Sequence, residues 1–175
     1  MDSSKAESLP VRLARLSFET YVREGKSIPV PDVFPKEWTT RRAGVFVSLH
    51  KRGELRGCIG TISPLTGSIA EEIIMNAVSA AVHDPRFRPV TAEELPEIDC
   101  SVDVLSPAED IRGPEELDVK RYGVIVSSHG RRGLLLPNLD GVETVEDQID
   151  IARRKAGISR GEPYKLQRFE VVRYE

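Results

Sequence analysis

The chain has 175 residues, of which 39% are hydrophobic and 30% are charged, and its net charge at pH 7 is −3. This composition excludes an intrinsically disordered chain and argues against a general attraction to nucleic acid or anionic membranes, and we expect residues 1–175 to form a single domain. The sequence has two isolated cysteines, no apolar signal-peptide core in residues 1–10 and no apolar stretch near the ~20 residues of a membrane span. These features predict a cytoplasmic protein without a disulfide framework.

A helix and a connector open the chain. Residues 10–24 carry apolar side chains on one side, with Pro10 in the first turn and Gly25 as a natural stop, which predicts a helix. Residues 28–38 contain three prolines. Because proline lacks the backbone N–H donor, we expect this segment to be an extended connector without a regular element.

The next segment has the pattern of a β-hairpin. Apolar and polar residues alternate over 45–50, which is typical of a strand. Residues 51–54 predict a turn in which Gly53 can adopt a positive φ, and residues 55–62 predict the returning strand.

A capped helix and a short strand follow the hairpin. The segment 68–71 (SIAE) forms a capping box and opens a helix with a wide apolar stripe, which we expect to end near Asp84. Residues 91–95 carry a second capping box and predict a short helical turn. Residues 98–104 then alternate as a half-buried strand with Cys100 on its core side.

The second half of the chain repeats the order of the first. GVIVSSH at 123–129 matches GVFVSLH at 44–50 at five of seven positions, and a basic glycine turn and a returning strand follow each. A helix capped by Thr144 and stopped by Gly157 then precedes a closing strand over 164–174.

We infer an internal duplication of a hairpin-helix-strand unit, with pseudo-repeats at roughly 43–105 and 122–174. The alternative is that two hairpins converged on similar strand chemistry. Because units this small could not bury their sheet faces alone, we expect an α+β fold in which the two halves share one core.

Cys58 is the first candidate for chemistry. On a regular strand, Arg56, Cys58 and Gly60 point to one face, whereas Gly57 points to the other. Arg56 and Cys58 would lie about 6.6 Å apart along the strand, where a guanidinium favours thiolate over thiol. Glycine inside a strand indicates a bulge or the close approach of a ligand or another backbone. The segment predicts a reactive thiol or an exposed binding strand; the alternative is a small buried cysteine beside two packing glycines.

The segment 76–88 is the second candidate. Asn76 lies in the middle of the predicted helix, where asparagine is unfavourable without a specific role. Asp84 and Arg86, in the HDPRF run after the helix, could orient a bidentate contact to a carboxylate or a phosphate. An anionic small molecule is therefore a candidate ligand; the alternative is a helix-ending turn with surface arginines and Phe87 in the core.

Signatures of metal and cofactor sites are missing from the sequence. Three histidines and two cysteines show no HxxxH, CxxC or HExxH spacing, so we expect no metal site. The sequence contains no P-loop, no GxSxG elbow and no GxGxxG in a dinucleotide-binding context, so we expect no cofactor. His50 and His129 occupy matching strand ends, and we interpret both as turn residues.

Three motifs together resemble the AMMECR-type domain family: LRGCIG at 55–60, NAVSAAVHDPRFRPV at 76–90 and VLSPAE at 104–109. Residues 122–157 resemble its prokaryotic branch, the AmmeMemoRadiSam system protein A, and the resemblance spans about residues 10–174. It implies an α+β fold with a duplicated unit around one shared, barrel-like, mostly antiparallel sheet. Asn138 stands where many relatives carry glutamine, so a hydrogen bond that needs the longer side chain is in doubt.

The resemblance implies a Memo-like protein and a radical SAM protein as partners, without naming an activity, so whether the chain is an enzyme stays open. Our first hypothesis is an accessory or substrate-presenting component that works with these partners through a cleft around the LRGCIG strand. The second is a small-molecule modification enzyme in which Cys58 is the nucleophile and Asn76, Asp84 and Arg86 orient an anionic substrate. The third is RNA or DNA binding through arginine pairs, which the acidic balance disfavours.

Overall fold

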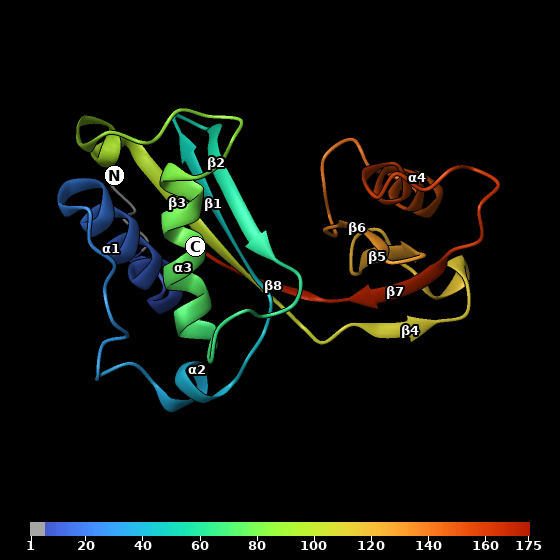
Figure 1. Cartoon of the computed structure of the whole chain (residues 1–175), viewed down its shortest axis with the longest axis horizontal. Coiled ribbons are helices and arrows are strands. Elements are labelled where there is room, and N and C mark those ends of the chain that lie inside the picture. Colours follow the sequence, from blue (N-terminus) through green and yellow to red (C-terminus); the bar gives the residue numbers. More distant parts are fainter. Residues whose placement is uncertain (1–5) are drawn as a thin grey trace. The chain divides into compact units, whose positions relative to one another are not determined.

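The computed structural model describes residues 6–175 and divides the chain into two compact units (Figure 1). Unit 1 contains the chain up to Val104 together with Val172–Glu175, and unit 2 contains Leu105–Val171. Among the helices of these residues, none is long and apolar enough to cross a bilayer. The expectation about a signal peptide involves residues 1–5, which lie outside the described residues.

Unit 1 is an antiparallel sheet covered on one face by helices. Its elements are α1 (Leu9–Glu24), α2 (Lys36–Thr40), β1 (Val45–Lys51), β2 (Glu54–Thr61), α3 (Ile69–Val82), the 3-10 helix η1 (Ala92–Glu97), β3 (Ile98–Leu105) and β8 (Val171–Tyr174). The strand order is β2-β1-β3-β8. Helix α3 packs against β1 and β2, and α1 packs against α3 (Figure 1).

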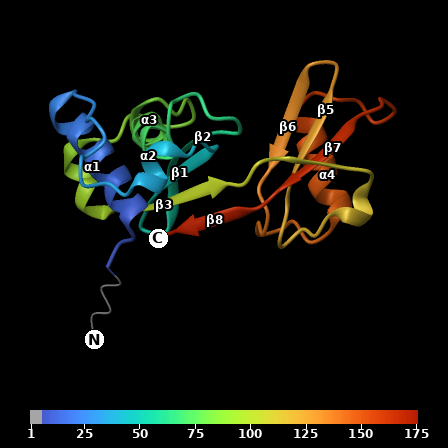
Figure 2. The same ribbon diagram turned by 90° about the horizontal axis from the view of Figure 1, so that it is seen from below.

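Unit 2 repeats this plan with fewer helices. Its elements are β4 (Glu109–Ile111), the 3-10 helix η2 (Pro114–Glu116), β5 (Gly123–Ser128), β6 (Arg131–Leu135), α4 (Val145–Lys155) and β7 (Lys165–Phe169). The strand order is β4-β7-β5-β6, so β5, β6 and β7 correspond to β1, β2 and β3 of unit 1. Helix α4 packs against β5 and β6, as Figure 2 shows.

The prediction of one shared, barrel-like sheet is wrong, because the strands form two separate four-stranded sheets and no closed barrel occurs within residues 6–175. The α+β class is confirmed. Each sheet has its own apolar core, around Val47 and Ile73 in unit 1 and around Val126 and Ile149 in unit 2. A unit can bury its sheet face by itself because its own helix covers that face.

Each sheet obtains its fourth strand from the continuation of the other unit's third strand. After β3 the chain enters β4, which pairs with β7, and after β7 it enters β8, which neighbours β3. The single closing strand predicted over 164–174 is therefore wrong. It is interrupted at Glu170, and its two parts, β7 and β8, belong to different sheets.

Local start and stop signals explain most element boundaries. Gly25 ends α1 with φ +68° and Gly157 follows α4 with φ +69°, in the left-handed region that favours glycine. The hydroxyl of Ser68 accepts the N–H of Glu71 at 3.2 Å at the start of α3. The connector prediction is wrong for residues 36–38, which begin the short helix α2 directly after Pro35.

Gly57 lies where the backbone of α3 packs directly on β2. A Cβ at this position would overlap the carbonyl oxygen of Ala80, and a Cβ at Gly133 of β6 would overlap the carbonyl oxygen of Ala152. Gly57 and Gly133 therefore have the same structural role: each lets the backbone of the covering helix lie directly on the sheet.

We predict that Gly57→Ala lowers the free energy of unfolding by about 1–3 kcal/mol, because the added methyl group must displace backbone atoms of α3. The control is Gly161→Ala, where an added Cβ meets nothing within 4 Å, and we expect a change within about 0.5 kcal/mol. Urea unfolding at pH 7 measures both. Equal stability of the two variants would contradict the close packing of β2 on α3.

Candidate functional site

The β1–β2 hairpin places Cys58 on the sheet face opposite α3. Cys58 lies across from Ser48 in the register of the hairpin, and its Sγ is 3.2 Å from the Ser48 hydroxyl. Gly60, two residues along the strand, lies against the ring of Phe46 on β1, where a Cβ would overlap the ring. Gly57 points the other way, toward α3, as the alternation along the strand predicts.

The outward backbone groups of Cys58 are hydrogen-bonded by the loop that follows α3. Because β2 is an edge strand, these groups have no neighbouring strand to pair with. The N–H of Cys58 donates to Oδ2 of Asp84 at 3.0 Å, and Nη2 of Arg86 donates to the Cys58 carbonyl at 3.3 Å. The two side chains therefore take the place of a fifth strand at this one residue.

Asp84 and Arg86 also bind each other. The backbone N–H and Nε of Arg86 donate to Oδ1 of Asp84 at 3.0 and 3.1 Å, and Nη2 donates to Oδ2 at 2.8 Å. These hydrogen bonds lower the pKa of the Asp84 carboxyl to about 2, although burial opposes the shift. The side chain of Asp84 is 2% exposed and that of Arg86 is 57% exposed. Arg86 thus makes a bidentate contact to a carboxylate, and this carboxylate is that of Asp84 in the same loop.

Arg56 is held by partners other than Cys58. The register of the hairpin shifts between Leu49 and His50, which leaves Arg56 as the extra residue of a β-bulge. Within the described chain, its guanidinium donates to Glu94 at 3.1 and 3.0 Å and to the carbonyls of Arg88 and Pro89. This contact lowers the pKa of Glu94 to about 2. Arg56 therefore connects η1 to the hairpin through hydrogen bonds.

Asn76 is buried in α3 and points to the start of the hairpin. Its Nδ2 donates to the carbonyl of Val45 at 3.0 Å and to the hydroxyl of Thr61 at 3.2 Å. The structure thus brings Cys58, Asp84 and Arg86 together, whereas Arg56 and Asn76 connect the hairpin to other elements. Substrate binding by these residues stays a prediction.

Three residues of this sheet face were not singled out from the sequence. Ser48 contacts the Cys58 thiol, and Asp103 on β3 lies opposite Phe46 in register. Asp103 is 1% exposed and accepts two hydrogen bonds of 2.8 Å from Arg173 of β8. The alternation of apolar and polar residues over 98–104 predicts on which face of the sheet the Asp103 side chain lies. Nothing local indicates Arg173, because β8 is far away in sequence.

The charged side chains around Cys58 are already paired with one another, and among the described residues no base contacts its sulfur. Hydrogen bonds to Asp84 and to Asp103 raise the pKa of Arg86 and of Arg173, respectively. The hydrogen-bond partner of the sulfur is the Ser48 hydroxyl, which is not a general base. In the portion of the chain that the structure describes, no three His, Cys, Asp or Glu side chains form a metal-binding group.

Comparison with known proteins identifies the family. The model of the AMMECR1 family matches residues 11–175. A protein from Clostridium acetobutylicum is 51% identical over 176 residues, which cover 99% of this chain but 37% of that protein. A protein from Thermotoga maritima is 51% identical over 167 residues, 94% of this chain and 96% of that protein. The crystal structure of an uncharacterized protein from Pyrococcus horikoshii has a TM-score of 0.86 at 35% identity, and the match covers 94% of this chain and 88% of that one.

We predict that Asp84→Asn lowers the free energy of unfolding at pH 7 by about 1–2 kcal/mol, a value reduced by solvent screening at the exposed Arg86. The folded-state pKa of about 2 lies below the ordinary 3.8, so the stabilisation is complete above about pH 5 and is lost as the pH falls toward 2. We therefore expect the difference from wild type to shrink by about half at pH 3.

Urea unfolding at pH 7, 4 and 3 measures this difference, with the exposed Asp32→Asn as the matched control. The control should change stability by less than about 0.5 kcal/mol at each pH. A difference for Asp84→Asn that is the same at pH 3 and pH 7 would show that its carboxylate is not held in the ionised form.

Proposed function

The chain belongs to the AMMECR1 family, and we propose that it is an accessory protein that presents the sheet face around Cys58 to a Memo-like protein and a radical SAM protein. The family match confirms the resemblance carried by the motifs at 55–60 and 76–90. The two partners follow from the AmmeMemoRadiSam branch of that resemblance. The proposal concerns binding, and it assigns Cys58 a role as a contact residue.

One observation carries the proposal: the charged side chains nearest Cys58 are occupied with holding the strand in place. Asp84 binds the Cys58 N–H and Arg86, and Asp103 binds Arg173. A general base within hydrogen-bonding distance is one way to activate a nucleophilic cysteine, and here the thiol instead contacts the Ser48 hydroxyl. This arrangement makes a rigid surface, which lowers the entropy lost on binding a partner.

The same contacts determine how a partner can bind. Strand addition at the edge of β2 would need the outward N–H and carbonyl of Cys58. Asp84 and Arg86 already bind both groups. A partner must therefore contact the side-chain face, where the exposed part of Arg86 and the half-buried Cys58 offer a small polar surface.

The relatives also support an accessory role. The homologous segment makes up 37% of the Clostridium protein, whereas the Thermotoga protein is matched over 96% of its length. The same domain thus occurs both as nearly a whole protein and as part of a longer one. Joining a domain covalently to other segments raises their effective concentration, which benefits proteins that act together.

We predict that Cys58→Trp weakens binding to the purified Memo-like and radical SAM proteins of the same cell at least tenfold, because the indole fills the presented face. Cys58→Ser keeps the size of the side chain, so its affinity should stay within twofold of wild type. The matched control is Glu54→Trp, at an exposed site of the same strand, which should also stay within twofold. Isothermal titration calorimetry measures each dissociation constant, and circular dichroism checks folding.

The proposal fails if neither protein binds the wild-type chain, or if Cys58→Trp binds as tightly as Glu54→Trp. Loss of binding in Cys58→Ser would also contradict it, since serine preserves the shape of the surface. In that case the sulfur itself would be required.

The alternative function is an enzyme that uses Cys58 as its nucleophile, which the guanidinium of Arg86 at the Cys58 carbonyl favours. Iodoacetamide labelling of the native protein at pH 7, read by mass spectrometry, separates the two. The accessory role predicts that Cys58 labels no faster than free cysteine. Cys100 is the internal control and should stay unlabelled, because burial raises its pKa to about 12. Faster labelling of Cys58 than of free cysteine would favour the enzyme.

A further inference from the structure

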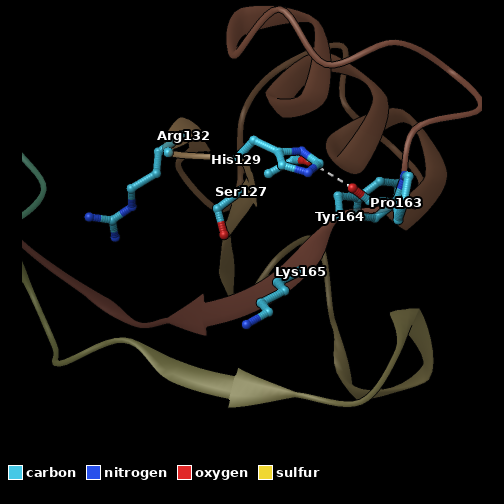
Figure 3. Close-up of a pocket in the computed structure, with 8 residues that line it drawn as sticks. Ser127, His129, Arg132, Pro163, Tyr164 and Lys165 are labelled. Atoms are coloured by element: carbon cyan, nitrogen blue, oxygen red, sulfur yellow. Dashed lines mark hydrogen bonds between the residues drawn. The ribbon is translucent and has the colours of Figure 1, made fainter.

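In unit 2, two cationic side chains flank a serine in one row across the sheet. Ser127 of β5 lies opposite Arg132 of β6 and opposite Lys165 of β7. Residues directly opposite in antiparallel strands point to the same face. Arg132 and Lys165 are therefore about 10 Å apart at the backbone, with the serine hydroxyl between them. Figure 3 shows Ser127 between these two side chains.

The two cations have no anionic partner in the part of the chain that the structure describes. Neither Arg132 nor Lys165 forms an ion pair there, although Arg131 binds Glu162 and Arg168 binds Glu109 nearby. An anion between them would gain charge-assisted hydrogen bonds from both side chains and from the Ser127 hydroxyl.

The row belongs to a pocket of about 560 Å³. The lining residues are Ser127, Ser128, His129, Gly130, Arg132, Pro163, Tyr164 and Lys165, and none of them is acidic. The volume lies in the range of small-ligand sites, which is about 300–1,000 Å³. A phosphate alone would fill only a fraction of it.

The opposite side of the pocket consists of rings. His129 is held at φ +48° in the β5–β6 turn, and its Nδ1 is 3.0 Å from the hydroxyl of Ser128. The same hydroxyl donates to the carbonyl of Pro163 at 2.8 Å, which ties the turn to the segment that carries Tyr164. In Figure 3, His129 points toward Pro163 and Tyr164, away from Arg132. Flat rings of this kind stack on an aromatic ligand.

We propose that this pocket binds a mononucleotide. Its phosphate would lie between Arg132 and Lys165 above Ser127, and its base would lie against the rings of His129 and Tyr164. The guanidinium supplies a planar fork for phosphate oxygens and the lysine supplies a point charge. The ligand class follows from charge at one end of the pocket and aromatic surface at the other.

The test is a titration of the full chain with AMP, adenosine and inorganic phosphate, followed by the NMR shifts of the amides of Ser127, His129 and Gly130. We expect AMP to shift these amides and to bind at least tenfold more tightly than adenosine or phosphate. Arg132→Gln and Lys165→Gln should each weaken AMP binding at least tenfold. The matched control is Lys120→Gln, which removes the same charge from unit 2 outside the pocket and should change the affinity by less than twofold.

Four results would overturn the proposal. AMP could leave the three amides unshifted, or the two pocket variants could bind it no more weakly than Lys120→Gln. Inorganic phosphate could bind as tightly as AMP, which would remove the base from the ligand class. A six-residue oligoadenylate could bind more than tenfold more tightly than AMP with a steep salt dependence, which would make the surface an RNA site.

Discussion

The surface around Cys58 in unit 1 depends on one requirement, which is that an edge strand cannot leave its outward backbone groups without partners where water is partly excluded. Asp84 and Arg86 meet this requirement at Cys58, with the N–H bound by a carboxylate and the carbonyl bound by a guanidinium. Because the loop after α3 provides both groups, the helix, the loop and the returning strand form one connected structure. The position of the Cys58 sulfur follows from this network.

The fourth strand of each sheet follows the third strand of the other sheet in sequence. Each sheet therefore depends on a segment of chain that continues from the other sheet. Arg173 of β8 neutralises Asp103, which is almost fully buried on β3. The ring of Tyr174 packs edge-on against the ring of Trp38, with 5.3 Å between the ring centroids. This contact holds the end of β8 in unit 1. An isolated first repeat would therefore leave Asp103 as an uncompensated buried charge, a strongly destabilising condition. The two repeats are compact units, but the first repeat does not contain all the residues that its own sheet needs.

Sequence reasoning succeeded where the determinants were local. The helix over 9–24, both hairpins and the caps at Ser68 and Thr144 follow from residues within one or two turns of each other. The strand glycines indicated a bulge as one possibility, but not that Arg56 would be its extra residue or that Arg56 would bind Glu94, which is 38 residues away in sequence.

The break at Glu170 was missed for a related reason. Residues 164–174 contain no glycine or proline that would mark a break, and only pairing with strands distant in sequence divides them between two sheets. The partner of Glu170 at this crossing is Ser106, which accepts the N–H of Glu170 with its hydroxyl and donates its own N–H to the Glu170 carbonyl. Contacts of this kind depend on which strands are neighbours in a sheet, and the pattern of side chains along one strand does not specify its neighbours.

The two units present different side chains at equivalent positions of their sheets. Ser48 and Ser127 occupy the same place in the repeated GVxVS segment. Their cross-hairpin partners are Cys58 in unit 1 and Arg132 in unit 2. On the other side of the serine, unit 1 has Ser101 where unit 2 has Lys165. One backbone arrangement thus carries a hydroxyl between a thiol and a second hydroxyl in unit 1, and a hydroxyl between two cations in unit 2.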